Sequence, residues 1–89
     1  MSVSKTISEE NSFSNSILIG ADHFSISIQG TFVATVTLQK TYNEVDWLDV
    51  QTFTLSGEFF GLEPEGSKYR IGVKTGDFTS GSVNVRLGA

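Results

Sequence analysis

The sequence predicts an all-β protein, a single antiparallel β-sandwich of jelly-roll or Ig-like type with about six to seven strands. Apolar residues recur at every second position through most of the chain, which is the spacing of half-buried strands. No segment carries the i, i+3, i+4, i+7 apolar spacing of an amphipathic helix over three turns. The nine glycines, together with Pro64, punctuate the chain as the turns of a sandwich do.

The first residues differ in composition from the rest of the chain. Residues 1–14 are rich in Ser, Glu and Asn, and their apolar anchors are Val3, Ile7 and Phe13. A segment with so few apolar residues buries little surface and tends to stay mobile. We therefore expect residues 1–14 to form a flexible N-terminal arm that orders only against a neighbouring subunit, and residues 15–89 to form the β-sandwich domain.

Seven strand candidates follow the arm, each bounded by glycine or a polar turn. In chain order they are 16–19, 24–29, 31–42, 47–55, 58–63, 68–74 and 82–87. Thr, Val, Phe and Ile dominate these segments, and all four residue types favour strands. The apolar parity changes within 47–55, which predicts a β-bulge near Gln51 or Thr52.

The parity of each strand predicts which side chains enter the core, because successive side chains point to opposite faces of a sheet. The residues expected inside are Phe24, Ile26, Ile28, Phe32, Ala34, Val36, Leu38, Tyr69, Ile71, Val73, Val83, Val85 and Leu87. The alternate set, which includes Thr35, Thr37 and Gln39, is expected to face water. Hydrophobic burial must supply the stability, since the chain has no cysteine.

Length and charge exclude several classes of protein. Eighty-nine residues suit one domain. A formal net charge of −4 argues against a nucleic-acid partner, which requires clustered Lys and Arg to displace counterions from phosphates. No apolar run reaches the roughly 20 residues that cross a bilayer, and the N-terminus lacks the apolar stretch of a secretory signal. We expect a soluble protein with no membrane partner.

No residue set in the sequence is typical of an active site. His23 stands beside Asp22 in a turn bounded by glycine, without a nucleophile-elbow serine, and we interpret it as a solvated turn residue. Glu58, Glu63 and Glu65 could be considered as a glycosidase carboxylate pair, but nothing places two of them across a sugar. The sequence therefore predicts a protein that is not an enzyme and has no catalytic residues.

Three acidic residues precede or begin the strand 47–55, namely Glu44, Asp46 and Asp49, and they could offer oxygen ligands to Ca²⁺. They lack the alternating Asp/Asn pattern that makes a calcium loop recognisable. We interpret them as the solvated end of a hairpin, and we expect neither a metal nor another cofactor.

Aromatic residues offer a candidate surface for sugars. Trp47, Tyr42 and Tyr69 could form a platform for sugar rings. A sandwich of this size needs a large buried ring, however, and we expect Trp47 to belong to the core.

Lys68, Arg70 and Lys74 alternate along one strand and form a basic stripe on one of its faces. Such a stripe usually pairs with acidic neighbours or faces water, and it could also meet an acidic partner surface.

Longer stretches of the chain carry a family resemblance. Gly30-Thr-Phe-Val-Ala-Thr-Val-Thr-Leu-Gln-Lys40 is followed by a polar turn, by Trp47-Leu-Asp-Val50, by Tyr69-Arg-Ile-Gly-Val73 and by Thr79-Ser-Gly-Ser-Val-Asn-Val-Arg-Leu87. This order resembles the small β-sandwich virion proteins of tailed bacteriophages over residues 24–88. The family has an Asp-Gly-Gly turn before the tryptophan, whereas residues 42–46 contain no glycine, so this loop must have a different shape.

The resemblance implies a non-enzymatic bacteriophage virion structural protein, in first place a capsid decoration or cement protein that acts through protein–protein contacts. The alternatives are a tail or head–tail joining component of the virion, or a carbohydrate-binding module. The implied partners are other virion proteins, either major capsid or tail proteins, and further copies of the chain in a homo-oligomer. The implied location is the virion, after synthesis in the host cytoplasm.

Overall fold

The computed structural model describes residues 2–89, so Met1 of the predicted arm lies outside the described residues. The strands are β1 Ser2–Ile7, β2 Ser12–Phe13, β3 Ile17–Ile19, β4 Asp22–Thr41, β5 Leu48–Phe53, β6 Gly57–Glu63 and β7 Ser67–Gly88. Every pairing is antiparallel, which confirms the predicted all-β class. Within residues 2–89 the structure contains no helix long and apolar enough to cross a membrane.

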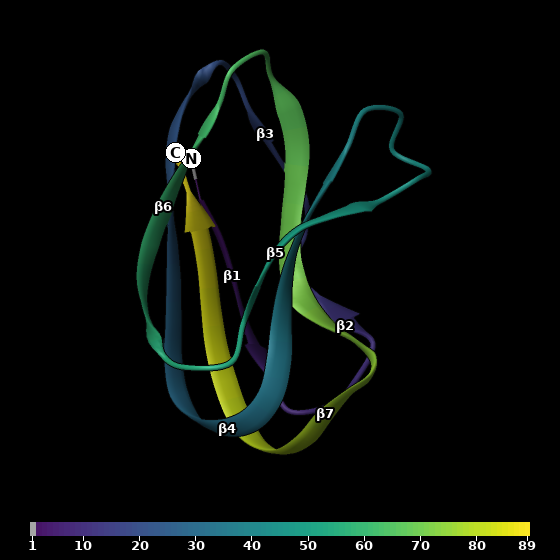
Figure 1. The fold of residues 1–89 in the computed structure, drawn as a ribbon, viewed down its shortest axis with the longest axis vertical. Helices are drawn as coiled ribbons and strands as arrows, with labels where there is room; N and C mark the ends of the chain where they lie inside the picture. The colour runs from purple at the N-terminus through teal and green to yellow at the C-terminus, as the bar shows by residue number, and fades with distance from the viewer. Residues whose placement is uncertain (1) are drawn as a thin grey trace.

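Two long strands, β4 and β7, build both layers of the sandwich. They have 20 and 22 residues, pair with each other along most of their length and bend together (Figure 1). The first layer contains β6, the first half of β4, the second half of β7, and β1. The second layer contains β5, the second half of β4, the first half of β7, and the short strands β2 and β3. The sequence predicted two strands in place of each long one, because the residues at the bends interrupt the apolar alternation.

The bends depend on local breaks in the β4–β7 ladder. Residues 74–77 of β7 face only Thr35 of β4, so β7 bulges outward where the ladder passes from one layer to the other. Gly81 has a φ of 92°, and a Cβ at this position would overlap the carbonyl oxygen of Thr31. Glycine is therefore required at position 81, where β7 passes Thr31 of β4.

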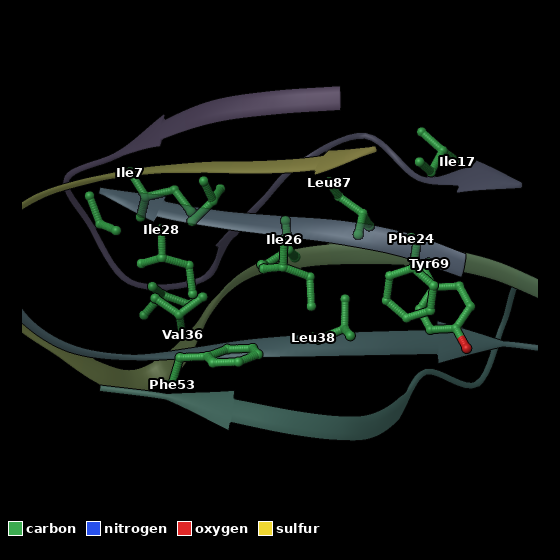
Figure 2. Close-up of a cluster of buried hydrophobic side chains, with 14 of the residues drawn as sticks. Ile7, Ile17, Phe24, Ile26, Ile28, Val36, Leu38, Phe53, Tyr69 and Leu87 are labelled. Atoms are coloured by element: carbon green, nitrogen blue, oxygen red, sulfur yellow. The ribbon is translucent and has the colours of Figure 1, made fainter. Parts of the chain in front are cut away.

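The hydrophobic core lies between the two layers (Figure 2). Its buried members are Ile7, Ile17, Ile19, Phe24, Ile26, Ile28, Val36, Leu38, Phe53, Tyr69, Ile71, Val73, Val83, Val85 and Leu87. The predicted inward parity is confirmed for all these residues that it named, while Phe32 and Ala34 are only partly buried against the cluster. The predicted bulge is also present, with Val50 as the unpaired extra residue of β5.

The structure corrects the expectation of a flexible arm. β1 pairs with the end of β7 from Ser2 opposite Gly88 to Ile7 opposite Val83, and Ile7 is fully buried. The prediction was wrong because it rested on the composition of side chains, which does not show whether the backbone of a segment pairs with a strand elsewhere in the chain. The edge of β7 would otherwise leave a row of unpaired N–H and C=O groups, which β1 satisfies.

The segment after β1 continues along the same strand. The Ser14 N–H donates to the Ile71 carbonyl oxygen at 2.8 Å, and the Ile71 N–H donates to Ser14 Oγ at 3.1 Å. On either side of this contact, β2 and β3 pair with residues 72–73 and 67–69 of β7. Residues 2–19 are thus an integral part of both layers.

Candidate binding surfaces

The residues considered for catalysis are dispersed over the structure. His23 is exposed on β4, and its backbone N–H donates to Asp22 Oδ1 at 2.7 Å. Glu58 accepts hydrogen bonds on the outer face of the first layer, Glu63 is buried at the end of β6, and Glu65 is exposed in the following turn. The structure therefore does not bring these groups together.

The three acidic residues considered for Ca²⁺ each bind a different partner. Glu44 pairs with Lys68, Asp46 accepts a hydrogen bond from Asn43 Nδ2 at 3.1 Å, and Asp49 pairs with a lysine of β7. Within residues 2–89 no group of three or more metal-ligating side chains is placed to hold an ion.

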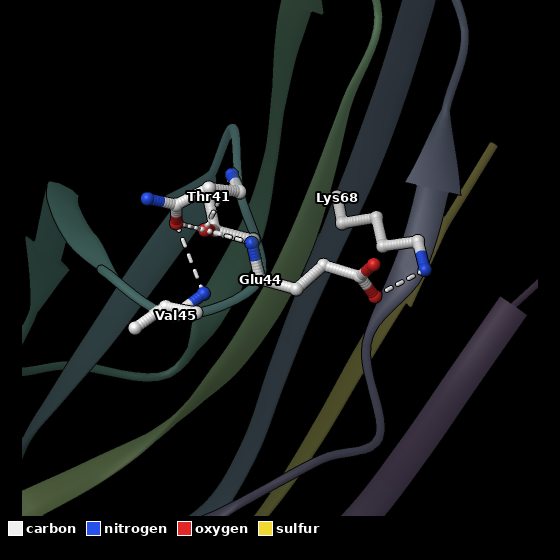
Figure 3. Close-up of polar contacts among 5 residues, drawn as sticks. Thr41, Glu44, Val45 and Lys68 are labelled. Carbon is white, nitrogen blue, oxygen red and sulfur yellow. Dashed lines mark hydrogen bonds and ion pairs between the residues drawn. The ribbon is translucent and has the colours of Figure 1, made fainter.

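Side chains shape the loop 42–47 in place of glycine (Figure 3). Thr41 Oγ1 accepts the backbone N–H groups of Asn43 and Glu44, and Asn43 Oδ1 accepts that of Val45 at 2.9 Å. Glu44 adopts a φ of 63°, and its carboxylate binds Lys68. Short polar side chains that accept nearby backbone N–H groups thus shape this turn without glycine.

The basic stripe on β7 is paired, as expected for such a stripe. Lys74 Nζ lies 2.7 Å from Asp49 Oδ2, and Arg70 Nε donates to Gln39 Oε1 at 2.9 Å. Gln39 Nε2 in turn donates to Asp49 Oδ1 at 2.9 Å. These side chains form one polar network across β5, β4 and β7 on the outer face of the second layer.

Arg70 also lies between two aromatic rings. Its guanidinium carbon is 4.2 Å from the ring centroid of Phe13 on one side and 4.2 Å from that of Trp47 on the other. The expectation that Trp47 belongs to the core is therefore wrong, because the ring packs on a cation at the outer face. This stack joins the N-terminal segment to the loop before β5.

The stack and the network close the outer face of the second layer. Thr37, expected in water, is fully buried, and Gln39 is 6% exposed. The expectation that both residues face water is therefore wrong, because parity indicates on which side of a strand a side chain lies but not whether other residues cover that side. The proposed aromatic platform is also not formed, since Tyr69 is in the core while Tyr42 is exposed beside Lys40.

A buried carboxylate closes one end of the sandwich. Glu63 accepts a hydrogen bond from the Tyr69 hydroxyl at 2.6 Å and from the N–H groups of Glu65 and Gly66 at 2.9 Å each, and Lys40 Nζ lies 3.6 Å away. The hydrogen bond from Tyr69 is the main reason that the pKa of Glu63 falls to about 2. Burial and this carboxylate raise the pKa of Tyr69. The sequence Glu63-Pro-Glu-Gly66 indicates a turn, but it does not indicate that the side chain of Glu63 is buried.

Exposed apolar side chains gather where β5 and β6 form the edges of the two layers. Among the strands of residues 2–89, each of these two pairs with β4 alone, so both leave one side unpaired. The β5–β6 edge, as we call it, carries five of the nine large apolar side chains that are exposed in residues 2–89: Leu48 (49%), Val50 (44%), Leu55 (75%), Phe60 (84%) and Leu62 (58%). Large apolar side chains that stay exposed along open strand edges are candidates for a contact site.

A second open surface is the outer face of the first layer. It contains a hollow of about 580 Å³ lined in part by His23, Ser25, Phe60, Arg86 and Gly88. The sequence offers His23 only as a rejected catalytic candidate and does not single out the other lining residues, because the hollow depends on the register between strands that are distant in the chain.

Comparison with known proteins supports the fold and leaves the function open. No family model and no curated protein matches the chain. Among solved structures, the chain is similar to the crystal structure of the Yersinia pseudotuberculosis-derived mitogen, with a TM-score of 0.55 at 10% sequence identity, covering 100% of this chain and 84% of that chain. At this identity the similarity shows a shared β fold alone.

Proposed function

We propose that this protein is a non-enzymatic bacteriophage virion structural protein, a capsid decoration or cement protein, with a tail or head–tail joining position as the alternative. The observation that carries the proposal is the β5–β6 edge. Leu55 and Phe60 expose 75% and 84% of their surfaces, and burying one such side chain in an interface contributes about 1.5–3 kcal/mol. The resemblance of residues 24–88 to phage virion sandwiches supplies the biological setting.

Unpaired strand edges add a second reason to expect contact there. β5 and β6 present free backbone groups beside the apolar side chains, and an added strand from a partner can satisfy them. β5 contains neither lysine nor proline, the residues that commonly protect such edges.

The dimensions of the chain indicate how much of its surface an interface must use. The principal extents are 36 × 26 × 17 Å, so the largest side measures about 900 Å² in outline, compared with about 800 Å² per partner in a stable interface. A stable contact therefore requires a whole side of the molecule. The β5–β6 edge, which draws on strands of both layers, extends over such a side better than a single strand does.

The carbohydrate-binding alternative is not supported in its original form. It required Trp47, Tyr42 and Tyr69 on one exposed face, whereas Tyr69 is 2% exposed and Trp47 packs on Arg70.

A protein inventory of purified phage particles by mass spectrometry tests the virion role. The chain should be present in a copy number that is a fixed multiple of a structural protein of the particle. Particles that assemble from a genome carrying Leu55→Lys should lose the chain, whereas Ser8→Lys, an exposed change in the loop after β1, should leave it attached. Intact wild-type particles without the chain would overturn the proposal.

A further inference from the structure

The register of the first layer places one row of residues across four strands. Ser25 of β4 lies opposite Phe60 of β6 and opposite Gly88 of β7, and Gly88 lies opposite Ser2 of β1. The side chains of Ser2, Ser25 and Phe60 point away from the core, since their neighbours in sequence point into it. Gly88 lies in the same row and has no side chain. Glycine and serine leave the middle of the row low, while the 84%-exposed Phe60 ring projects at one end.

Arg86 extends into this low region from the next row. A Cβ at Gly88 would lie 3.2 Å from Nη1 and 3.3 Å from Nη2 of Arg86, so the guanidinium lies against the bare backbone of β7. No hydrogen bond or ion pair of Arg86 is formed within the described residues 2–89. The pKa of Glu58 is lowered mainly by a hydrogen bond from Ser27, and the charge of Arg86 is close enough to that carboxyl group to contribute. Glu58, in the same row as Arg86, instead accepts hydrogen bonds from Ser27 Oγ at 2.6 Å and Gln29 Nε2 at 2.9 Å.

The surface around Arg86 is large enough for a small ligand and is unusually rich in hydroxyl and amide groups. The hollow of about 580 Å³ is within the range of ligand sites, about 300–1,000 Å³. A second hollow of about 530 Å³ shares Arg86 and is lined for the rest mainly by polar side chains: Ser4, Lys5, Thr6, Ser27, Gln29 and Asn84.

We infer that this surface binds a sugar that carries a carboxylate, such as a uronic acid residue. The Arg86 guanidinium has the planar fork that binds a carboxylate with two hydrogen bonds. The Phe60 ring, across Ser25 from Gly88, offers an apolar surface for one face of the sugar ring. Hydroxyl and amide groups of the face can exchange hydrogen bonds with the sugar hydroxyls. The inference does not require a role in the virion, but Phe60 also belongs to the β5–β6 edge, so a partner bound at that edge and a sugar would compete for this ring.

The surroundings of Arg86 favour a sugar over an acidic peptide. Extended peptides bind by pairing with an open strand edge, whereas Arg86 and Gly88 lie on β7, which is paired with β4 on one side and β1 on the other and is thus separated from the open edges of β6 and β1. The hydroxyl and amide groups that line the two hollows suit a ligand with several hydroxyl groups. The large exposed ring of the lining, that of Phe60, is at the rim of the first hollow.

Titration of backbone amide chemical shifts of the intact protein tests this inference with three probes. Methyl glucuronide should shift Ser25, Arg86 and Gly88, whereas methyl glucoside, which lacks the carboxylate, should bind at least about tenfold more weakly because it loses a charge-assisted bidentate contact. Acetylated triglutamate supplies carboxylates without a sugar ring and should not produce these shifts.

Variants assign the roles of the two main residues. Arg86→Gln should weaken glucuronide binding at least about tenfold. Lys68→Gln, which removes a charge from the second layer and lies outside both hollows, should leave the affinity unchanged. Phe60→Ala should weaken glucuronide binding without altering the fold. Equal binding of glucoside and glucuronide, binding that survives Arg86→Gln, or shifts with triglutamate alone would each overturn the inference.

Discussion

The Tyr69 hydroxyl donates a hydrogen bond of 2.6 Å to Glu63, a carboxylate that is 1% exposed. Figure 2 shows Tyr69 at one end of the core, beside Phe24, with its hydroxyl directed away from the apolar side chains. The second carboxylate oxygen accepts two backbone N–H groups of the β6–β7 turn. The buried charge is therefore fully hydrogen-bonded, and it links the turn to the core.

Acid should destabilise the fold through Glu63. Hydrogen bonds from Tyr69 and from the turn, together with Lys40, lower the pKa of Glu63 from 4.5 to about 2. Because the folded-state pKa lies below the unfolded one, this stabilisation is complete above pH 4.5 and is lost as the pH falls toward 2. The difference corresponds to about 3 kcal/mol of unfolding free energy, to be measured by urea unfolding across this range.

Two variants separate Glu63 from the other carboxyl groups. Glu63→Gln should be less stable than the wild type at neutral pH and should depend less steeply on pH between 4.5 and 2, with the remaining dependence coming from carboxyl groups such as Asp49 and Glu58, whose pKa values are also lowered. Glu65→Gln, an exposed change in the same turn, should keep the wild-type dependence. A Glu63→Gln variant with an unchanged pH profile would contradict the assignment.

The N-terminal segment should be required for folding. Ile7 is fully buried, so Ile7→Ala should cost about 2–5 kcal/mol of unfolding free energy. Lys5→Ala, an exposed change in the same strand, should cost less than about 0.5 kcal/mol. Deletion of residues 2–14 should abolish cooperative thermal unfolding, measured by circular dichroism. A deletion variant that unfolds cooperatively at the wild-type temperature would restore the idea of a mobile arm.

Arg70 should stabilise the fold through the contact of its planar guanidinium with the rings of Phe13 and Trp47, and not through its charge alone. Arg70→Lys keeps the charge but loses the planar group, so it should cost about 1–2 kcal/mol in urea unfolding. Lys68→Arg, at an exposed ion pair, serves as the control and should change stability by less than about 0.5 kcal/mol.

A double-mutant cycle tests the stack directly. Arg70→Lys and Trp47→Ala should be less destabilising together than the sum of the single changes, with a coupling of about 0.5–1 kcal/mol. Strict additivity would show that the two groups do not interact.

Local alternation was enough to predict much of the core. The inward positions of Ile71, Val73 and Val85 follow from parity within one strand, which needs no knowledge of the rest of the fold. The same reasoning failed for Ser2–Ile7, whose order depends on the free edge of β7, a feature that arises only when distant strands pair.

The binding surfaces were predicted less well for a related reason. Trp47 was expected inside because it is large, but its position is set by Arg70, a residue of another strand. The sequence does not indicate a binding role for Arg86. That role depends on the missing side chain at Gly88 and on the register of β7 with β4 and of β4 with β6.

Light scattering coupled to size-exclusion chromatography tests most directly the claim that the protein acts by contact through its β5–β6 edge. At increasing concentration, the wild-type chain should reach a defined multiple of the monomer mass. A variant with both Val50→Lys and Leu55→Lys should remain a folded monomer, because charges on an apolar contact surface are costly to bury. A wild-type chain that stays monomeric at every concentration, or an oligomer that this double variant leaves intact, would contradict the account.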